Sequence, residues 1–382
     1  MTALLWIVSS AALALDLIFE DPTPTRGDEF GSFGAIAVDG NHVLIGARFD
    51  DTQGFSVGQA HLFDAGTGNL LQTFNDPTPT QQDFFGNSVA LDGDYVLIGA
   101  NRDDTQGIDV GQAHLFDATT GNLLQVFNDP TPTDGDWFGR SVAIDGGHVL
   151  IGARHDDTLG VDVGQAHLFD ASTGNLLHTF NDPTPTRQAF FGHWVAINGN
   201  HVLISALGDH QAHLFDANTG DLLQTFNDPT PSSGDHFAIA VAIDGNNALI
   251  GNTGEAHLFD ISTGSLLRTL DDPTPDDYNR FGWSVALDGN LAIVGSVGDM
   301  FSPSFGQAHL FDLGTGILLQ SFDHPTPANF TRFGESVALA GNLVIIGAPY
   351  DDMHRHYVGR VHLFAVPARP VAINIKPQDS KN

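Results

Sequence analysis

A single repeat runs through the chain from end to end. The tripeptide His-Leu-Phe occurs seven times, beginning at His61, His114, His167, His213, His257, His309 and His362. A Phe-Gly pair marks the other half of the unit in six copies, and Phe237-Ala238 takes its place in the fifth. A period near 50 residues is typical of propellers, solenoids and arrays rather than of ordinary domains. The repeat, and not the length of 382 residues, therefore decides how many domains we expect, and we expect one.

Each repeat predicts four β-strands. In the second copy, residues 87–91 and 95–98 are rich in β-forming side chains and are separated by the sequence DGD, a strong signal for a tight hairpin. The segments QAHLFDA and NLLQVF follow, joined through TTG, which suits a bulged hairpin turn. Runs such as YVLIGA are apolar at successive positions, so both faces of the small sheet must be covered. We therefore expect four-stranded antiparallel sheets that stack face to face.

The two ends of the chain are complementary. The last unit stops at VHLFAVPARP without its fourth strand, whereas LDLIFEDPTPT near the N-terminus is the end of a unit without its beginning. A ring closed by that exchange leaves no open sheet edge, while an open solenoid would need polar caps. The sequence predicts an all-β fold, a seven-bladed β-propeller of four-stranded antiparallel blades over residues 15–366. The N-terminal strand completes the last blade, and residues 367–382 form a C-terminal tail.

Residues 1–14 form an apolar leader. Small residues at Ala12 and Ala14 suit a signal-peptide cleavage site, but the basic segment that precedes a typical signal peptide is missing. The two interpretations are a truncated signal peptide and a buried first strand. Asp16 ends the apolar run too early for a transmembrane helix, so we expect no membrane span in the mature chain.

The charge of the chain excludes one class of partner. Acidic residues number 46 against 14 basic ones, which gives a formal net charge of -32. Nucleic acid is not an expected partner, because its binding needs a basic surface. Self-repulsion favours a soluble monomer, although cation binding or a saline habitat would also fit this charge. There is no cysteine, so neither a disulfide nor a Cys-ligated metal enters the argument.

Three copies carry the fullest form of the repeat: FGNSVALDGDYVLIGANRDD at 85, FGRSVAIDGGHVLIGARHDD at 138 and FGESVALAGNLVIIGAPYDD at 333. These segments resemble the FG-GAP repeat family, the repeat of the integrin α-subunit propeller and its bacterial relatives. The resemblance implies a secreted or cell-surface propeller that binds a protein or glycan partner and is not an enzyme. In integrins the hairpin loops hold calcium through a D-x-D-x-D-G stretch. Here the hairpins spell only DGD, DGG or DGN, too few residues for the six or more oxygens that calcium takes.

Paired aspartates follow the second strand of four repeats and are the candidate metal ligands. They are Asp50, Asp51, Asp103, Asp104, Asp156, Asp157, Asp351 and Asp352. Each pair could bind calcium with nearby carbonyl groups, but aspartate also caps its own backbone in tight loops, and we favour that interpretation. We therefore expect no cofactor, with weak Ca²⁺ binding as the alternative.

Two adjacent repeats have lost the long loop after the second strand. The fourth copy keeps only LGDH and the fifth little more than NTG, which predicts a notch in the rim lined by His193, Trp194, Asp209, His210 and His236. An exposed tryptophan beside histidines and an acid is typical of interfaces and sugar sites, so we expect a protein or glycan partner to bind there. Ordinary loop drift is the alternative.

Catalytic motifs are absent from the sequence: there is no Cys nucleophile, no G-x-S-x-G, no H-E-x-x-H and no phosphate loop. The alternative function is a propeller enzyme, either a quinoprotein-like dehydrogenase, which LFDAxTGNLL resembles, or a polysaccharide lyase or hydrolase. An enzyme would gather His, Asp, Glu, Arg or Tyr side chains in one central cluster that breaks the sevenfold pattern. A scaffold would place small, equivalent residues around its channel.

Overall fold

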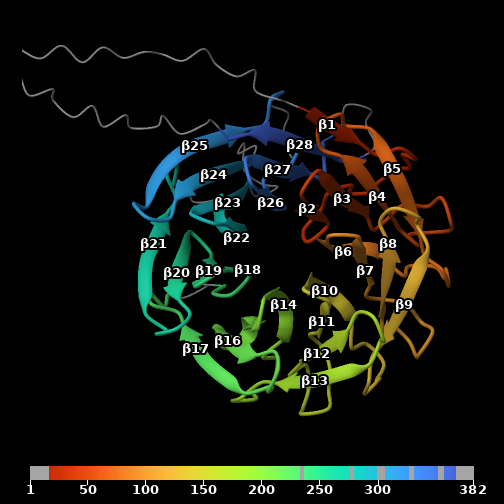
Figure 1. Ribbon diagram of the computed structural model, residues 1–382, viewed down its shortest axis with the longest axis horizontal. Coiled ribbons are helices and arrows are strands. Elements are labelled where there is room, and N and C mark those ends of the chain that lie inside the picture. The colour runs from red at the N-terminus through yellow and green to blue at the C-terminus, as the bar shows by residue number, and fades with distance from the viewer. Residues whose placement is uncertain are drawn as a thin grey trace, which may run out of the picture.

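The computed structural model describes residues 17–232, 236–275, 279–298, 306–326, 331–351 and 357–366. The leader, the tail and Asp352 lie outside these residues. The described chain forms a ring of seven four-stranded antiparallel sheets around a central channel, as the sequence predicts (Figure 1). Its one helix in these ranges is a short 3-10 turn, η1 (Leu207–Asp209). Over the described residues, no helix has the length and apolar character that a membrane span requires.

The blades are numbered from the first complete sheet, and each is given from its innermost strand outwards. Blades 1 to 4 are β2 (Ile36–Asp39), β3 (His42–Ala47), β4 (Gln59–Asp64) and β5 (Leu70–Asn75); β6 (Phe85–Asp92), β7 (Tyr95–Ala100), β8 (Gln112–Asp117) and β9 (Leu123–Asn128); β10 (Phe138–Asp145), β11 (His148–Ala153), β12 (Gln165–Asp170) and β13 (Leu176–Asn181); β14 (Phe191–Asn198), β15 (His201–Ala206), β16 (Gln211–Asp216) and β17 (Leu222–Asn227). Blades 5 to 7 are β18 (Val241–Asp244), β19 (Asn247–Asn252), β20 (Glu255–Asp260) and β21 (Leu266–Asp271); β22 (Asn279–Asp288), β23 (Leu291–Gly298), β24 (Gln307–Asp312) and β25 (Ile317–Asp323); β26 (Val337–Ala340), β27 (Leu343–Ala348), β28 (Arg360–Ala365) and β1 (Leu17–Glu20).

Blade 7 is built from both ends of the described chain. Strand β1 pairs antiparallel with β28, with Leu17 opposite Leu363 and Glu20 opposite Arg360. The side chain of Phe19 is buried, and its ring lies 5.1 Å from the ring of Phe63 in blade 1. The N-terminal strand is thus the outer strand of the last blade, which confirms the predicted closure.

Glycines explain why the repeat carries its Phe-Gly and Gly-Ala signals. A Cβ atom built on Gly46 would lie 2.0 Å from the carbonyl oxygen of Gly86 in the next blade, and one on Gly99 would lie 2.1 Å from that of Gly139. The second strand of each blade therefore touches the Phe-Gly backbone of its neighbour, and this contact leaves no room for a side chain. Between blades 4 and 5 both glycine positions are substituted, by Ser205 and Ala238.

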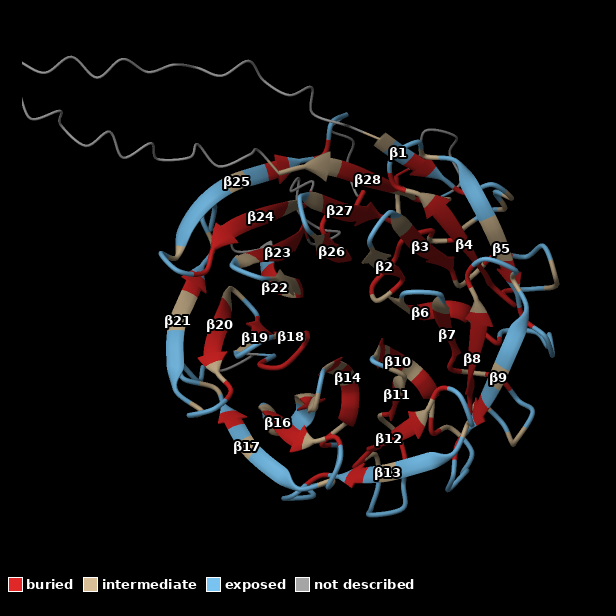
Figure 2. Cartoon of the chain, viewed as in Figure 1, coloured by how far each residue is buried: buried red, intermediate tan, exposed pale blue. Residues whose placement is uncertain are grey.

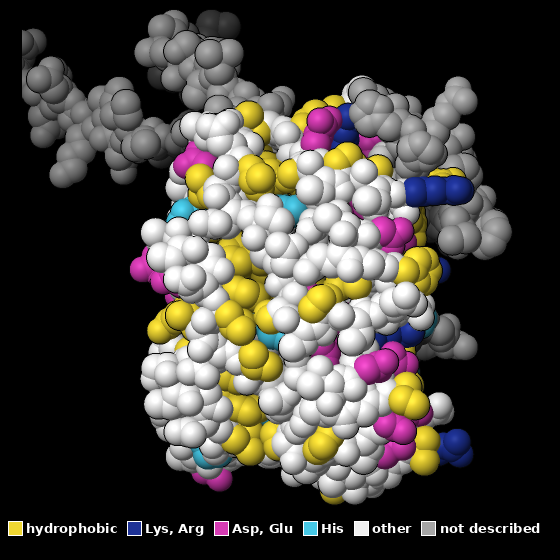
Figure 3. Space-filling model, turned by 90° about the vertical axis from the view of Figure 1, so that its right-hand side faces the viewer, with side chains coloured by type: hydrophobic (Ala, Val, Ile, Leu, Met, Phe, Trp, Pro, Cys, Tyr) yellow, Lys and Arg dark blue, Asp and Glu magenta, His cyan; other side chains and the backbone are white. Residues whose placement is uncertain are grey.

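Burial falls from the inner strands to the outer ones (Figure 2). The phenylalanine of each Phe-Gly pair is buried and packs edge to face on the phenylalanine of His-Leu-Phe, as for Phe85 and Phe116, whose ring centroids are 6.1 Å apart. The outer strands expose pairs of leucines such as Leu70 and Leu71, and hydrophobic side chains gather in patches on the outer wall (Figure 3).

The direction of the strands defines two faces. The links between blades and the loops after each second strand emerge together, on what we term the loop face. The two short hairpins of each blade emerge on the opposite side, the hairpin face. Each innermost strand runs from the loop face to the hairpin face, so its first residues surround the channel mouth on the loop face.

Candidate ligand site at the mouth of the central channel

The side chains around the loop-face mouth break the sevenfold pattern. The repeat position directly after Phe-Gly, or Phe-Ala in blade 5, begins the innermost strand and carries a different residue in each of six blades: Asn87, Arg140, His193, Ile239, Trp283 and Glu335. All of these residues except Ile239 carry a side-chain group that can form a polar or charged contact. The sequence argument associates a central cluster of this kind with an enzyme, and small equivalent residues with a scaffold.

An aromatic group closes the channel beneath this mouth. The ring of Phe33 in blade 1 lies 4.4 Å from Trp194 in blade 4 and 5.4 Å from Trp283 in blade 6. Below it, Trp194 and the side chains of Ser88, Ser141, Ser284 and Ser336 line a small cavity of about 80 Å³. Aromatic rings from blades 1, 4 and 6 thus meet across the channel next to this cavity.

Arginines alternate with aromatic rings along the rim of blades 2 to 4. The guanidinium of Arg102 lies 4.8 Å from the ring of Phe84 and 4.9 Å from that of Trp137. The guanidinium of Arg154 lies 4.8 Å from the ring of the same Trp137 and 5.6 Å from that of Phe190. Such cation–π contacts hold arginine in place without neutralising its charge. We call this set the arginine–aromatic arc.

Hydrogen bonds fix the tautomers of two histidines at the mouth. Arg154 donates from Nη1 to Nδ1 of His193 at 2.9 Å and from Nε to Nε2 of His155 at 3.0 Å. Arginine can only donate, so the proton of His193 is on Nε2, and that of His155 is on Nδ1, from which it is donated to Oδ1 of Asp162 at 2.7 Å. Burial lowers the pKa of His155 and lowers that of His193 well below its usual range, so both rings are neutral.

Four buried donors at this mouth have no acceptor in the described chain: Arg140 Nη1, His193 Nε2, Arg48 Nε and Trp283 Nε1. Burial, together with the charges of Arg154 and Arg48, lowers the pKa of Arg140 to about 9, so its guanidinium remains charged at neutral pH. A buried donor without a partner is costly, and a buried unpaired charge more so. The site can regain that free energy by accepting an anionic oxygen.

Charges on the other side of the mouth are already balanced. Nη2 of Arg48 lies 2.6 Å from Oε2 of Glu29, which also accepts a hydrogen bond from the hydroxyl of Tyr350 at 2.8 Å through Oε1. Nε of Arg332 lies 3.2 Å from Oε2 of Glu335, and burial raises the pKa of Glu335 to about 7. Of the unsatisfied donors, Arg140 Nη1 and His193 Nε2 lie on the neighbouring blades 3 and 4, whereas Arg48 Nε and Trp283 Nε1 lie on blades 1 and 6.

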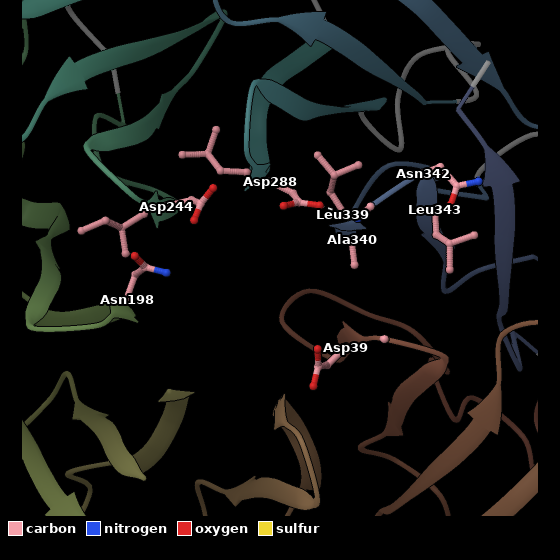
Figure 4. Close-up of a pocket in the computed structure, with 12 residues that line it drawn as sticks. Asp39, Asn198, Asp244, Asp288, Leu339, Ala340, Asn342 and Leu343 are labelled. Atoms are coloured by element: carbon pink, nitrogen blue, oxygen red, sulfur yellow. Dashed lines mark hydrogen bonds between the residues drawn. The ribbon is translucent and has the colours of Figure 1, made fainter. Parts of the chain in front are cut away.

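The hairpin-face mouth has the opposite character. Asp39, Asn198, Asp244 and Asp288 surround a hollow of about 460 Å³ and come from four different blades (Figure 4). These side chains are engaged in the fold, because the hairpin aspartate of one blade accepts a hydrogen bond from the hairpin glycine of the next, as Asp39 Oδ2 does from Gly93 N–H at 2.8 Å. The DGD-type hairpins therefore link neighbouring blades.

The five residues expected in the notch do not share one surface. His193 is buried and Trp194 is half-buried, because both lie on the innermost strand and face the channel. The expected exposed tryptophan is thus corrected to a channel residue. Asp209 accepts a hydrogen bond from the hydroxyl of Thr186, whereas His210 and His236 are exposed.

The two members of each described aspartate pair differ in burial. The second member of each described pair is exposed and caps its own loop, as Asp51 does by accepting from the amide of Ser56 at 2.6 Å and Asp104 from that of Asp109 at 2.7 Å. The first members, Asp50, Asp103, Asp156 and Asp351, are buried beneath the loop face. Asp50, Asp103 and Asp156 also cap their loops, because each accepts a hydrogen bond from the backbone amide two residues further on, as Asp103 does from Thr105 at 2.8 Å. Turn capping, the favoured interpretation, thus describes both members of these three pairs.

Sequence reasoning missed Arg140, Arg154 and His155 as site residues. The signal was present, because the position after Phe-Gly varies while its neighbours repeat, but a search for repeated residues overlooks it. His193 was selected for the notch and lies instead at the channel mouth.

Comparison with known families agrees with the fold. The FG-GAP repeat model matches residues 79–116, 131–169, 270–311 and 327–364. No curated protein matches the chain. The matched segments span the Phe-Gly inner strands of blades 2, 3, 6 and 7 and the His-Leu-Phe strands that follow them. The chain is a seven-bladed β-propeller that carries FG-GAP repeats.

Proposed function

We propose that the protein is a binding module that recognises an anionic ligand at the loop-face mouth of its channel. The observation that carries the proposal is the pair of buried donors, Arg140 Nη1 and His193 Nε2, that have no acceptor within the described chain. Unsatisfied donors on neighbouring blades are a favourable arrangement for a carboxylate or sulfate group, since each charge-assisted hydrogen bond is stronger than a neutral one.

The distribution of charge supports an anionic ligand. The chain carries 14 basic residues against 46 acidic ones, yet six of its arginines surround this mouth: Arg48, Arg102, Arg140, Arg154, Arg280 and Arg332. A local positive potential on an otherwise acidic surface would direct an anionic group to one place and repel it elsewhere.

The arginine–aromatic arc favours an acidic glycan as the ligand. Sugar rings pack on aromatic faces, and their carboxylate or sulfate groups pair with arginine. The net charge of -32 disfavours the long phosphate backbone of a nucleic acid, which would be repelled by the remaining surface. We therefore propose an oligosaccharide with carboxylate or sulfate groups, bound across blades 2 to 4.

An enzyme is the second candidate, because the central cluster breaks the sevenfold pattern. A general base must have a free lone pair within reach of its substrate. Both nitrogens of His155 are engaged, and Nδ1 of His193 accepts from Arg154, so neither histidine offers one. These contacts favour binding over catalysis, and the binding module is our proposal.

The test is an array of uronate-containing, sulfated and neutral oligosaccharides together with acidic peptides. We expect selective binding of the acidic oligosaccharides, weakened by added salt. Arg140→Met should weaken this binding by about 10-fold to 100-fold, the equivalent of one charge-assisted hydrogen bond. The control is Arg187→Met, an exposed arginine in the link before blade 4.

Binding of neutral oligosaccharides alone, or binding that Arg140→Met leaves unchanged, would contradict the proposal. Each bound sugar is also recovered and examined by mass spectrometry. Cleaved or oxidised products would identify the enzyme alternative instead.

We also propose that the protein is secreted or displayed at the cell surface and acts as a monomer. The FG-GAP repeat supports the location, since such propellers are commonly extracellular, and the strong net charge supports the monomer. Fractionation of expressing cells and light scattering of the purified protein test these two points. A purely cytoplasmic location, or a stable dimer, would contradict them.

A further inference from the structure

Below the loop face, each of blades 1 to 3 contains a buried pocket where three aspartates meet. One aspartate comes from the link between blades, one lies two residues before Phe-Gly, and one is the first member of the paired aspartates. In blades 1 and 3 the strand histidine of the same blade lies beside the link aspartate, and His114 is the equivalent residue of blade 2. The sets are Asp21, Asp28, Asp50 and His61 in blade 1; Asp76, Asp83, Asp103 and His114 in blade 2; and Asp129, Asp136, Asp156 and His167 in blade 3.

The carboxylates of a pocket are close together and lack a cation. In blade 2, oxygens of Asp76, Asp83 and Asp103 all lie within 4.8 Å of one another. The hydroxyl of Thr78 donates toward Asp103 Oδ2 at 3.3 Å, but Oδ2 of Asp76 has no hydrogen-bond partner in the described chain. No arginine or lysine of the described residues pairs with them. Three buried carboxylates without a counter-ion are unfavourable unless they bind protons or a metal.

The strand histidines provide an observation that is independent of the acids. His61 is fully buried, and its Nε2 lies 3.7 Å from Oδ1 of Asp21 without a hydrogen-bond partner in the described chain. In blade 3, Nε2 of His167 lies 4.0 Å from Oδ1 of Asp129 and is likewise unpartnered there. In both histidines Nδ1 contacts a threonine hydroxyl at 3.1 Å, so Nε2 is the ring nitrogen that is left to bind a ligand beside the link aspartate.

Blade 7 shows what happens when the acids are lost. His324 and Thr331 replace the first two aspartates, and Arg360 replaces the glutamine at the head of the third strand. Nη1 of Arg360 lies 3.8 Å and Nε2 of His324 lies 3.2 Å from Oδ2 of Asp351. Two carboxylates have gone from this pocket, and a guanidinium has entered it. In blade 7 the guanidinium of Arg360 thus supplies the positive charge that the pockets of blades 1 to 3 lack.

We propose that each of the pockets in blades 1, 2 and 3 binds one divalent cation through its three aspartates and its strand histidine. An oxygen-rich set with one imidazole suits divalent ions such as Ca²⁺, Mn²⁺ or Zn²⁺. The ion would tie the link between two blades to the loop and the third strand of the next. Blade 4 should bind none, because Ala189 stands in place of the aspartate before Phe-Gly.

The experiment is isothermal titration of chelator-treated full-length protein with CaCl₂, MnCl₂ and ZnCl₂ separately, followed by thermal melts in the preferred ion. We expect three equivalent sites for at least one ion and a melting temperature that rises when the ion is added, because the folded state alone has the pocket. Asp76→Asn should reduce the count from three to two. The double variant Asp76→His with Gln112→Arg, which introduces two of the three blade 7 residues, should also lose one site while it folds without metal.

The matched control is Asp104→Asn, the exposed aspartate beside Asp103, which should keep all three sites. No binding of any of the three ions at millimolar concentration, with an unchanged melting temperature, would overturn the proposal. An unchanged stoichiometry in Asp76→Asn would overturn it as well, because the ions would then be bound elsewhere.

Discussion

Closure of the ring by β1 can be tested with one side chain. Phe19 is 1% exposed and packs against Phe63, so Phe19→Ala removes a fully buried ring at the seam between blades 7 and 1. Deleting a buried phenylalanine side chain costs about 3–5 kcal/mol, through the lost burial and the cavity left behind. We expect a loss of that size in the free energy of unfolding, measured by denaturant titration followed by tryptophan fluorescence and circular dichroism.

Two variants serve as controls for this measurement. Ile18 is the neighbouring residue on β1 and is 49% exposed, so Ile18→Ala should change the free energy of unfolding by less than about 0.5 kcal/mol. Phe74 is the equivalent buried residue on β5, in a blade with no break, and Phe74→Ala should cost as much as Phe19→Ala. If Phe19→Ala is no more harmful than Ile18→Ala, β1 does not close the propeller in solution.

Three further predictions follow from the packing, the charges and the rim. Gly99→Ala should destabilise the fold by about 1–3 kcal/mol, because its Cβ would lie 2.1 Å from Gly139 O; an unchanged unfolding midpoint would refute the close contact between blades. Glu335 has its pKa raised to about 7 by burial, so the folded state holds a proton that the unfolded state loses above about pH 4.5, and stability falls as the pH rises between these values. In thermal melts, the melting temperature of Glu335→Gln relative to that of the wild type should therefore rise as the pH increases over that range. A difference in melting temperature that does not change with pH would refute this. His210→Ala removes an exposed side chain of the notch and should weaken binding of the proposed ligand. Binding equal to that of the wild type would show that the notch is not part of the binding site.

The fold was predictable because each local signal repeats. The DGD-type hairpins, the apolar runs and the complementary chain ends each specify part of a closed propeller. The predicted strands at 87–91 and 95–98 correspond to Phe85–Asp92 and Tyr95–Ala100, and only their ends differ. Strand ends depend on the contacts between blades, which propensity does not describe.

The site was harder to predict for a physical reason. A ring brings together residues that are about one repeat apart, so Arg140, Arg154 and His193 meet only when the blades are placed around the axis. Trp194 was expected on the rim, but the first strand of a blade is the one nearest the axis, and its side chain therefore meets Phe33 across the channel. The proposed metal pockets combine aspartates from a link and a loop with a histidine from a strand. Each of these residues taken alone is explained by turn capping or by packing.

A structure of the protein with the acidic oligosaccharide that binds most tightly in the array tests the central claim most directly. We predict that a carboxylate or sulfate oxygen of the ligand lies about 2.7–3.2 Å from both Arg140 Nη1 and His193 Nε2, with a sugar ring on the arginine–aromatic arc. A ligand bound at the hairpin face or on the outer wall, with both donors still without an acceptor, would contradict the account.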